Sequence, residues 1–532
     1  MREKQIIESV TRAREHDRGK PCHYYTRTDA ALPHDGGRYS SDRACPCHAS
    51  TSFIGSHQKF VFSYLDVHGK ALALSLRFGL LLLLFVLTGC QSSSGSQPVQ
   101  VTPLALTPSP TAHKPVTQNS ADWTTYHRDN TRAGYLADMP DPQRLTQGWN
   151  TKLDGAVYGE PLAVSGHILV ATENDTLYAL NAQTGQVVWH TNVGTPVAQA
   201  DLPCGNIFPL GITGTPVYDP ATKLVFAVAE ITGPAHVLVG VDANTGQVKV
   251  RRIVDPQGIE IAPHQERAAL ALFGNKVYVA LGGLAGDCGN YHGWVVGSQT
   301  DGNGPLLSYQ VPTPREGGIW AASGPAINAA GHLFVAVGNG ETTQGGWDHT
   351  DSILRLSPTL QLEDGFAPQN WQQENSQDAD LGSMGPLLLP NGLVFADGKS
   401  GLGYILHANA LGGINGQAQV LNICQSFGGA ATNGSRVFVP CTSGLQQLSL
   451  NPQGKLTHGW QAPGQVTGSP VIGGHTVYSL SGDGTLYALD SATGKVRTTV
   501  AIGQVSRFAT PTLSGSHVYV GTLNGVTAVV GS

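Results

Sequence analysis

The residues with the clearest capacity for chemistry in this sequence are its eight cysteines. Near the N-terminus, Cys22 is followed by a histidine, and the stretch ACPCHAS contains Cys45, Cys47 and His48. These are ligand types that zinc prefers, but their spacing matches no regular zinc finger. The sequence therefore gives little reason to expect zinc at this end of the chain.

Four further cysteines lie in the second part of the chain, at Cys204, Cys288, Cys424 and Cys441. An even number of cysteines in an exported domain favours disulfides, and four cysteines allow three pairings. The stretch CQSFGGAATNGSRVFVPC reads as two neighbouring strands with a turn between them, which favours Cys424–Cys441 and leaves Cys204–Cys288. Four free thiols are the alternative.

Two other stretches combine polar and aromatic residues. His292 and Trp294 in GNYHGWVVG are compatible either with lining a central channel or with packing against each other. The stretch GGWDHTDS is compatible with a metal site or with a polar surface loop, and its candidate residues are Trp347, Asp348, His349 and Asp351. The sequence contains no Gly-x-Ser-x-Gly elbow, no His-Glu-x-x-His zinc motif and no phosphate-binding loop.

An apolar run at residues 72–90, LALSLRFGLLLLLFVLTGC, ends in Leu-Thr-Gly-Cys at Cys90. About a dozen apolar residues follow Arg77, which suits a signal-peptide core and is short for a membrane span. The ending resembles a bacterial lipobox, so Cys90 is the predicted lipidation site; a plain signal-anchor helix is the alternative. The sequence thus predicts a lipoprotein held at a membrane, outside the cytoplasm.

Four parts of the chain follow from this reading. Residues 1–66 fit no signal peptide and indicate a start codon assigned too far upstream, with translation beginning near residue 67. Residues 67–89 are the predicted signal peptide, and residues 90–121, rich in Ser, Pro and Thr, suit a flexible tether. Residues 122–532 are the predicted folded domain.

Composition limits both the fold class and the partners. Only 13% of residues are charged, whereas Gly occurs 67 times in 532 residues, which favours an all-β protein. Residues 1–89 hold 12 Lys and Arg against 8 Asp and Glu, which leaves 19 against 29 and a charge of −10 in the remainder. Nucleic acid is therefore excluded as a partner, because binding phosphates requires clustered Lys and Arg.

One hairpin-like sequence occurs more than once in the chain. LYALNAQTGQVVWHTNVG at residues 177–194 returns as LYALDSATGKVRTTVAIG at residues 486–503. Both alternate apolar and polar residues, as antiparallel strands do. An Asx-x-x-Thr-Gly turn occurs three times, beginning at Asn181, Asp242 and Asp490, and its Gly suits the positive φ of a bulged hairpin.

Eight strand-initiating segments recur at intervals of roughly 40 to 60 residues. Units of this size, each of about four strands, must stack on their neighbours, and a β-propeller is the expected result. The last unit stops after three strands, and QGWNTKLDG at residues 147–155 echoes the missing outer strand. The sequence therefore predicts an eight-bladed propeller, closed by an N-terminal strand and without helix beyond short turns; seven blades are the alternative.

These repeats resemble the quinoprotein-type propellers, the PQQ-repeat family. LYALNAQTGQVVW is similar to its blade motif, and DWTTYHRDNTRAG at residues 122–134 is similar to its usual opening. The resemblance covers about residues 122–532. The family includes dehydrogenases that depend on PQQ and relatives without cofactor, among them scaffolds of outer-membrane protein assembly, so it implies the fold more strongly than the chemistry.

Within the resemblance, four residues take the positions of the dehydrogenases' functional groups. It implies Trp320 as the face on which the quinone stacks, Asn339 as a calcium ligand, Asp378 as the catalytic base and Lys399 as a cation beside the quinone. The family's adjacent Cys-Cys disulfide is missing. Its calcium-binding Glu has no counterpart, and Asp287 is at best displaced from that position.

These departures favour a binding or scaffold module that holds a protein or small ligand on one face of a monomeric ring. The alternative is a PQQ- and calcium-dependent alcohol or sugar dehydrogenase that passes electrons to an external acceptor, since no c-type haem motif is present. We expect Trp320 and Asp378 to face the channel and Asn339 to lack an acidic partner. A carboxylate within roughly 5 Å of Asn339, close enough to share one calcium, would instead favour the dehydrogenase.

Overall fold

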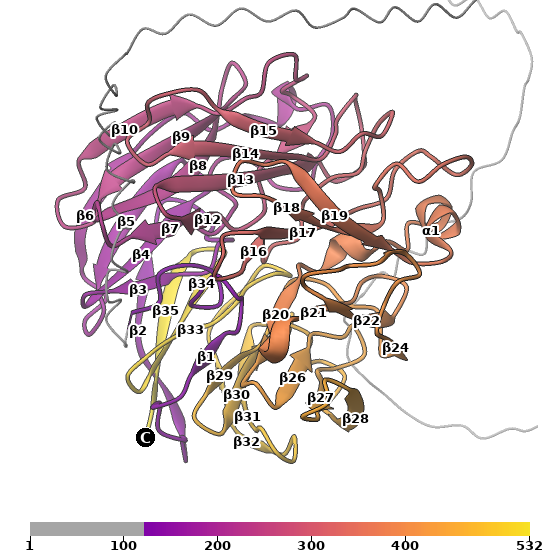
Figure 1. Ribbon diagram of the computed structural model, residues 1–532. Helices are drawn as coiled ribbons and strands as arrows, with labels where there is room; N and C mark the ends of the chain where they lie inside the picture. The colour runs from indigo at the N-terminus through magenta and orange to yellow at the C-terminus, as the bar shows by residue number, and fades with distance from the viewer. Residues whose placement is uncertain (1–121) are drawn as a thin grey trace, which may run out of the picture. The chain divides into compact units, whose positions relative to one another are not determined.

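A computed structural model describes residues 122–532. The predicted signal peptide, lipidation site and tether lie outside the described residues, as do the cysteines and histidine considered for zinc. Within the described part of the chain, no helix is long and apolar enough to cross a membrane. Eight sheets of four or five strands form an eight-bladed β-propeller, which confirms the predicted fold (Figure 1).

The blades follow one another along the chain, and each begins with its innermost strand. The first two consist of β3 (Leu162–Val164), β4 (His167–Thr172), β5 (Thr176–Asn181) and β6 (Val187–Asn192), then β7 (Val217–Asp219), β8 (Leu224–Ile231), β9 (Ala235–Asp242) and β10 (Val248–Ile253). The third and fourth consist of β11 (His264–Gln265), β12 (Ala271–Phe273), β13 (Lys276–Gly283), β14 (Trp294–Gln299) and β15 (Leu307–Gln310), then β16 (Ala326–Ile327), β17 (Leu333–Val337), β18 (Ser352–Leu356) and β19 (Leu362–Ala367), with β23 (Gly413–Ile414) added at the edge.

The second half of the ring repeats this plan. The fifth and sixth blades consist of β20 (Leu387–Leu389), β21 (Leu393–Ala396), β22 (Leu402–His407) and β24 (Gln419–Asn422), then β25 (Ala431–Thr432), β26 (Arg436–Val439), β27 (Gln446–Leu450) and β28 (Leu456–Gln461). The last two contain β29 (Val471–Gly473), β30 (Thr476–Leu480), β31 (Thr485–Asp490) and β32 (Val496–Ala501), then β33 (Thr512–Ser514), β34 (His517–Thr522) and β35 (Gly525–Gly531).

The ring closes as the sequence predicts. β2 (Leu145–Lys152) is the outer strand of the last blade and pairs antiparallel with β35, from Leu145 opposite Gly531 to Lys152 opposite Gly525. β1 (Tyr135–Leu136) pairs in parallel with β29 of the seventh blade. Because the two ends of the chain share blades, the ring has no open seam.

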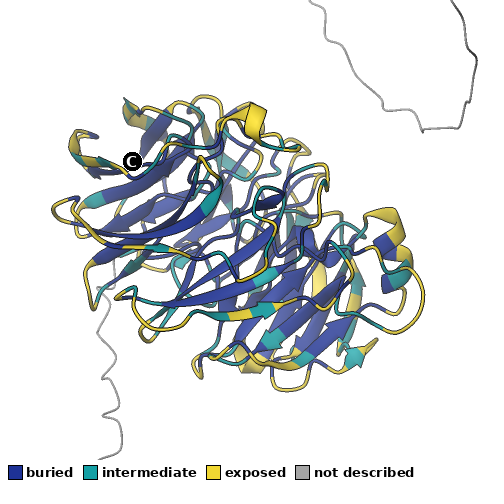
Figure 2. Ribbon diagram, turned by 90° about the horizontal axis from the view of Figure 1, so that it is seen from above, coloured by how far each residue is buried: buried dark blue, intermediate teal, exposed yellow. Residues whose placement is uncertain are grey.

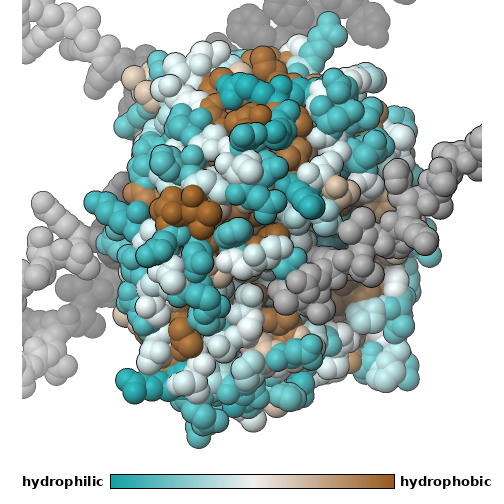
Figure 3. All heavy atoms as spheres, turned by 90° about the vertical axis from the view of Figure 1, so that its left-hand side faces the viewer, coloured by the Kyte–Doolittle hydropathy of each residue, from teal (hydrophilic) through white to brown (hydrophobic). Residues whose placement is uncertain are grey.

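Burial falls from the axis to the rim of each blade. β5 is almost entirely buried, whereas β6 alternates exposed and half-buried residues, and Figure 2 shows the same gradient around the ring. Apolar side chains pack between neighbouring blades in clusters that join consecutive sheets. The outer surface mixes polar and apolar residues (Figure 3), and its exposed apolar side chains include Val187 and Val188 on β6 and Ile253 on β10.

The repeated turn connects the third and fourth strands of one blade and contacts the outer strand of the preceding blade. The Asn181 carboxamide accepts hydrogen bonds from the backbone N–H groups of the next turn residues, at 3.0 Å each. Gly185 closes the turn with φ of 70°, and a Cβ there would lie 2.5 Å from the ring of Trp149. Trp149 lies on β2, the outer strand of the preceding blade, and its indole N–H donates to Ala182 O at 3.0 Å. Trp189 and Trp460 dock in the same way on the turns that begin at residues 242 and 490.

An N-terminal collar, residues 122–136, runs around one end of the channel and touches successive blades. Its backbone oxygens accept hydrogen bonds from the inner strands of blades 2, 4, 5, 6 and 7, and Trp123 pairs with Ala163 of blade 1. The buried Arg132 donates to Leu270 O and Pro325 O, at 3.2 and 2.8 Å. The collar therefore covers the end of the ring at which the inner strands turn into the second strands.

Candidate functional site

A cavity of about 480 Å³ lies at the other end of the inner strands, where loops lead into them. This volume is within the range of roughly 300 to 1,000 Å³ typical of small-molecule sites. Its walls combine cations with aromatic rings and one carboxylate. These residues are Tyr158, Arg267, Trp320, Asp378, Lys399, Phe427, Arg507 and Phe508.

Trp320 lies in the loop that leads into β16. Its indole is held against the backbone of Gly338, where a Cβ would come within 3.0 Å of the Trp320 Nε1. The Lys399 ammonium lies 5.3 Å from the ring centroid, and the Arg267 guanidinium lies 5.8 Å from it. The ring therefore forms a flat wall with cations at its face.

Asp378 enters the cavity from α1 (Trp371–Gln377), a helix that the repeat pattern did not predict. It caps the helix in the left-handed region with φ of 52°, and its side chain is 67% exposed. Lys399 forms ion pairs with Asp378 and, at 2.8 Å, with the buried Asp380. Burial alone would lower the pKa of Lys399, but the two carboxylates hold it above its usual value.

Asn339 has an acidic partner, so the expectation that it would lack one is wrong. Its side-chain nitrogen donates to the Glu316 Oε2 at 3.4 Å. Burial raises the pKa of Glu316; the Arg315 guanidinium opposes this, and neighbouring carboxylates, Asp287 and Asp378 among them, add to it. Glu316 also forms an ion pair with Arg315, so one cationic group already contacts this carboxylate.

Three of the four residues implied by the family resemblance line the same cavity: Trp320, Asp378 and Lys399. Asn339 follows Gly338, which contacts both the Trp320 ring and the Asp380 carboxylate. Three of the four residues therefore converge on one cavity although they span about eighty residues, whereas Asn339 is not among the residues that line it. The roles that the resemblance implies for these four residues stay predictions.

Sequence reasoning missed the two arginines of the cavity. The Arg267 guanidinium lies 4.1 Å from the Phe508 ring centroid, and that of Arg507 lies 3.9 Å from the Phe427 centroid. Burial, together with repulsion by Arg507, lowers the pKa of Arg267 to about 10. Among residues 122–532, no carboxylate forms an ion pair with either guanidinium. The cavity is therefore a place where positive charge is available to a ligand.

Glu316 was also missed, because it comes from a loop in the wrong place for the family's calcium-binding Glu. The one available signal was its position in the sequence: Glu316 lies in REGG, residues 315–318, directly before the stretch that contains Trp320. The arginines had no such signal, since they belong to loops of blades 3 and 8 that only ring closure brings together.

Both predicted disulfides are present. Cys204–Cys288 and Cys424–Cys441 have Cα separations of 6.2 and 5.6 Å. The first joins two loops whose residues Ile207 and Ala285 line the cavity. Disulfides form in oxidising compartments, which places the domain outside the cytoplasm.

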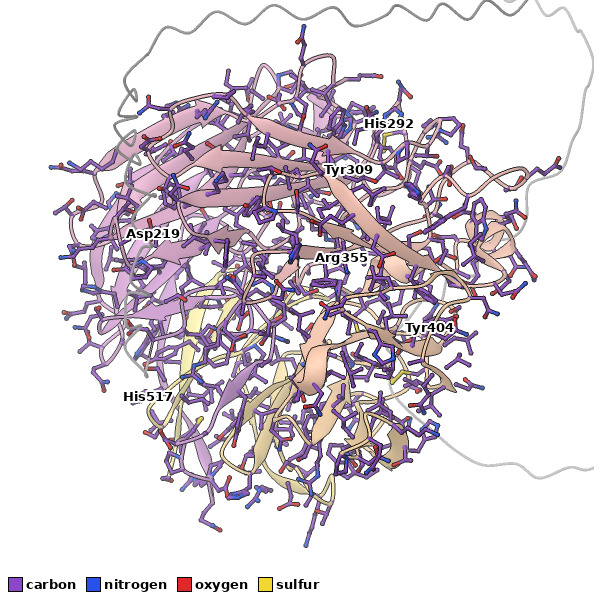
Figure 4. The ribbon with its side chains drawn as sticks, in the orientation of Figure 1. Asp219, His292, Tyr309, Arg355, Tyr404 and His517 are labelled. Atoms are coloured by element: carbon purple, nitrogen blue, oxygen red, sulfur yellow. A yellow bond between two sulfur atoms is a disulfide. The ribbon has the colours of Figure 1, made fainter. Side chains whose placement is uncertain are left out.

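The other sequence candidates form local structure. His292 is labelled in Figure 4; its backbone N–H donates to the His264 Nε2 at 3.1 Å, and neither His292 nor Trp294 lines the cavity. In the GGWDHTDS stretch, Asp348 caps the turn by accepting from Thr350 N at 3.2 Å. No cluster of three or more His, Cys, Asp or Glu suited to a metal occurs in the part of the chain that the structure describes.

With this geometry established, comparison with known proteins identifies the family. A family profile described as outer membrane protein assembly factor BamB, of the PQQ-repeat type, matches residues 141–400 and 421–531. The chain belongs to this PQQ-repeat family.

A curated relative is the polyvinylalcohol dehydrogenase of Sphingopyxis sp. (strain 113P3). It is 23% identical over an alignment of 508 residues that covers 80% of this chain and 74% of the relative. Two kinds of name therefore occur in the comparisons, a dehydrogenase and an assembly factor.

Solved structures show the same division. A europium-containing methanol dehydrogenase matches with a TM-score of 0.62 at 15% identity, covering 78% of this chain and 99% of that one. The quinohemoprotein alcohol dehydrogenase of Comamonas testosteroni has a TM-score of 0.57 at 14% identity, covering 77% and 80%. BamB from Moraxella catarrhalis has a TM-score of 0.51 at 15% identity, covering 73% and 100%. At these identities the likeness shows the fold alone, and function must be argued from the site.

Proposed function

We propose that this member of the PQQ-repeat family is an extracytoplasmic alcohol dehydrogenase that binds PQQ in the cavity beside Trp320 and a calcium ion at the Asn339–Glu316 pair. The observation that carries the proposal is the Glu316 carboxylate at 3.4 Å from the Asn339 amide. The atom that faces the carboxylate is the Asn339 Nδ2. With the amide turned over, its Oδ1 and the Glu316 carboxylate could serve one hard cation with oxygen ligands.

The cavity suits the cofactor's shape and charge. PQQ is a planar quinone with three carboxylates, and the Trp320 ring provides a flat face. Arg267, Arg507 and Lys399 provide positive charge, and the guanidinium of Arg267 is unpaired among the described residues. A planar anion in this cavity would compensate the repulsion between the two arginines.

Glu316 and Asn339 would hold the calcium. Calcium takes six to eight oxygen ligands, so two side chains are too few for tight binding by the protein alone. The remaining oxygens must come from water and from the cofactor. We therefore expect calcium to bind weakly without PQQ and tightly with it.

The chain's own residues would do the following chemistry. PQQ, when bound, supplies the two-electron acceptor. The exposed Asp378 carboxylate accepts the hydroxyl proton as the alcohol loses two electrons and two protons to become a carbonyl compound. Lys399 lies 5.3 Å from the Trp320 centroid and stabilises negative charge that develops over that face. An external acceptor then removes the electrons.

The test uses the purified protein with PQQ, CaCl₂, a panel of alcohols and sugars, and an artificial electron acceptor. We expect turnover that requires both additions, and quenching of tryptophan fluorescence on PQQ binding. Asp378→Asn should lower kcat by about 10³-fold, as expected for loss of a general base. It should leave PQQ binding intact.

The matched control is Asp301→Asn, at an exposed turn away from the cavity, which should retain full activity. Absence of both PQQ binding and turnover in the wild type would refute the dehydrogenase. That outcome would favour the second candidate, a binding or scaffold module on one face of the ring, which the BamB description of the family profile supports.

Membrane attachment is the remaining part of the proposal. The lipobox-like ending predicts that Cys90 carries a lipid, which would hold the propeller at the membrane through the Ser- and Pro-rich tether. Cys90→Ser in the native host should move the protein from the membrane fraction to the soluble fraction or leave it unprocessed. Unchanged membrane association would count against this attachment.

A further inference from the structure

The only α-helix in residues 122–532, α1, is an insertion between the outer strand of blade 4 and the inner strand of blade 5. Its residue Asn375 is buried and faces the loop that follows β17. The Asn375 Oδ1 accepts a hydrogen bond from Gly340 N at 3.1 Å, and its Nδ2 donates to Thr342 O at 2.9 Å and to the Thr350 Oγ1 at 2.8 Å. One side chain thus uses its acceptor and both donors to bind a single loop.

The two segments joined in this way carry the two halves of the candidate site. Gly340 directly follows Asn339, whose amide contacts Glu316. Asp378 caps α1, and its backbone N–H donates to the backbone oxygen of Asn375. The Asn375 side chain therefore contacts the loop that carries Asn339, and the Asn375 backbone contacts Asp378.

We propose that Asn375 is a positioning residue that sets the distance between the Asn339–Glu316 pair and the Asp378 carboxylate. The expected loss of kcat rests on the proposed dehydrogenase function, whereas the expected change in loop structure does not. A helix of seven residues has little stability of its own in water, so its place depends on such contacts. Movement of a catalytic group by about 1 Å can cost on the order of 10²-fold in rate.

The experiment compares Asn375→Ala and Asn375→Asp with Ser376→Ala in the full chain. Ser376 is exposed on the same helix, and its hydroxyl bonds only the helix backbone, at Gln373 O. With PQQ and CaCl₂ we expect Asn375→Ala to lower kcat by about 10²-fold and to weaken PQQ-dependent calcium binding about 10-fold, while KM for the alcohol changes less than about 3-fold. Ser376→Ala should match the wild type.

A second measurement does not depend on activity. Amide hydrogen exchange without ligand should show faster exchange at Gly340 in Asn375→Ala, because that N–H loses its acceptor. In Asn375→Asp the carboxylate still accepts from Gly340 but repels Thr342 O, so protection at Gly340 should persist while that of α1 falls. If the wild type were inactive but the variants showed these exchange changes, the dehydrogenase function would be refuted and the positioning role of Asn375 would stand. Unchanged exchange at residues 338–342 in Asn375→Ala, or equal loss of kcat in Ser376→Ala, would overturn the positioning role.

Discussion

Blades 1, 2 and 7 differ from blades 3 to 5 in how neighbouring sheets are joined. In the regular blades a tryptophan of one outer strand rests on the next blade's Gly turn and donates to the carbonyl that follows the turn's Asx residue. In the irregular region the equivalent carbonyls accept only from side chains of inner strands among the described residues: Tyr278 donates to Pro358 O at 2.9 Å, and Arg355, labelled in Figure 4, to Ala408 O at 2.7 Å. Tyr519 makes the same kind of contact to Ala182 O at 3.1 Å in a regular joint, beside Trp149, so the difference is the loss of the tryptophan.

The comparison shows that the contacts that join the regular blades and the candidate functional residues lie in different parts of the ring. Where Trp and Gly perform the docking, the turn sequence repeats. Where the tryptophan is absent, α1 is inserted, and Asp378 at its end lines the cavity together with Trp320 and Lys399. The candidate chemistry therefore lies where the repeat is weakest, which is common for sites built on repeated scaffolds.

The largest stability effect should come from the disulfides, each of which links a loop of the irregular region to a loop outside it. Cys204–Cys288 closes 84 residues and Cys424–Cys441 closes 17. In the chain-entropy model these loops correspond to about 4.6 and about 3 kcal/mol. Replacing each pair by serines and comparing denaturant midpoints should show the greater loss for Cys204–Cys288. Equal losses would mean that strain or residual structure, and not loop length, decides.

A smaller effect tests the regular region. Gly185→Ala places a Cβ against the Trp149 ring at a φ of 70°, and should cost about 3 kcal/mol. Gly166→Ala is the matched control, because its φ is 80° but nothing lies within 4 Å of the added Cβ, so it should cost only about 1 kcal/mol. Similar costs for the two variants, measured by urea unfolding, would contradict the docking role of Trp149.

A pH dependence tests a buried carboxyl group of the irregular region. Burial raises the pKa of Asp397, which directly precedes the segment with Lys399, to about 8. The native state therefore binds more protons than the unfolded state between about pH 4 and 8, and stability falls as pH rises, by about 1.4 kcal/mol per pH unit for one group. Asp397→Asn should flatten the slope of unfolding free energy between pH 5 and 8. The control variant Asp483→Asn, at an exposed position, should leave that slope unchanged. If Asp397→Asn instead kept the wild-type slope, other buried carboxylates would be its cause.

The sequence by itself determined the features that depend on local pattern. The repeated turns at Asn181, Asp242 and Asp490 predicted hairpins, and their period predicted eight blades. The missing last strand and its echo at residues 147–155 predicted how the ring closes. These inferences succeed because alternation, turn chemistry and period are properties of adjacent residues.

Only the tertiary structure decided which side chains meet. Arg267 and Arg507 are 240 positions apart and become neighbours because closing the ring places blades 3 and 8 around one channel. Glu316 reaches Asn339 from another loop, and the Asn375 contacts depend on an insertion that breaks the repeat. Such contacts depend on loop paths, which no period in the sequence encodes, and they decide whether this propeller holds a cation beside a flat cofactor.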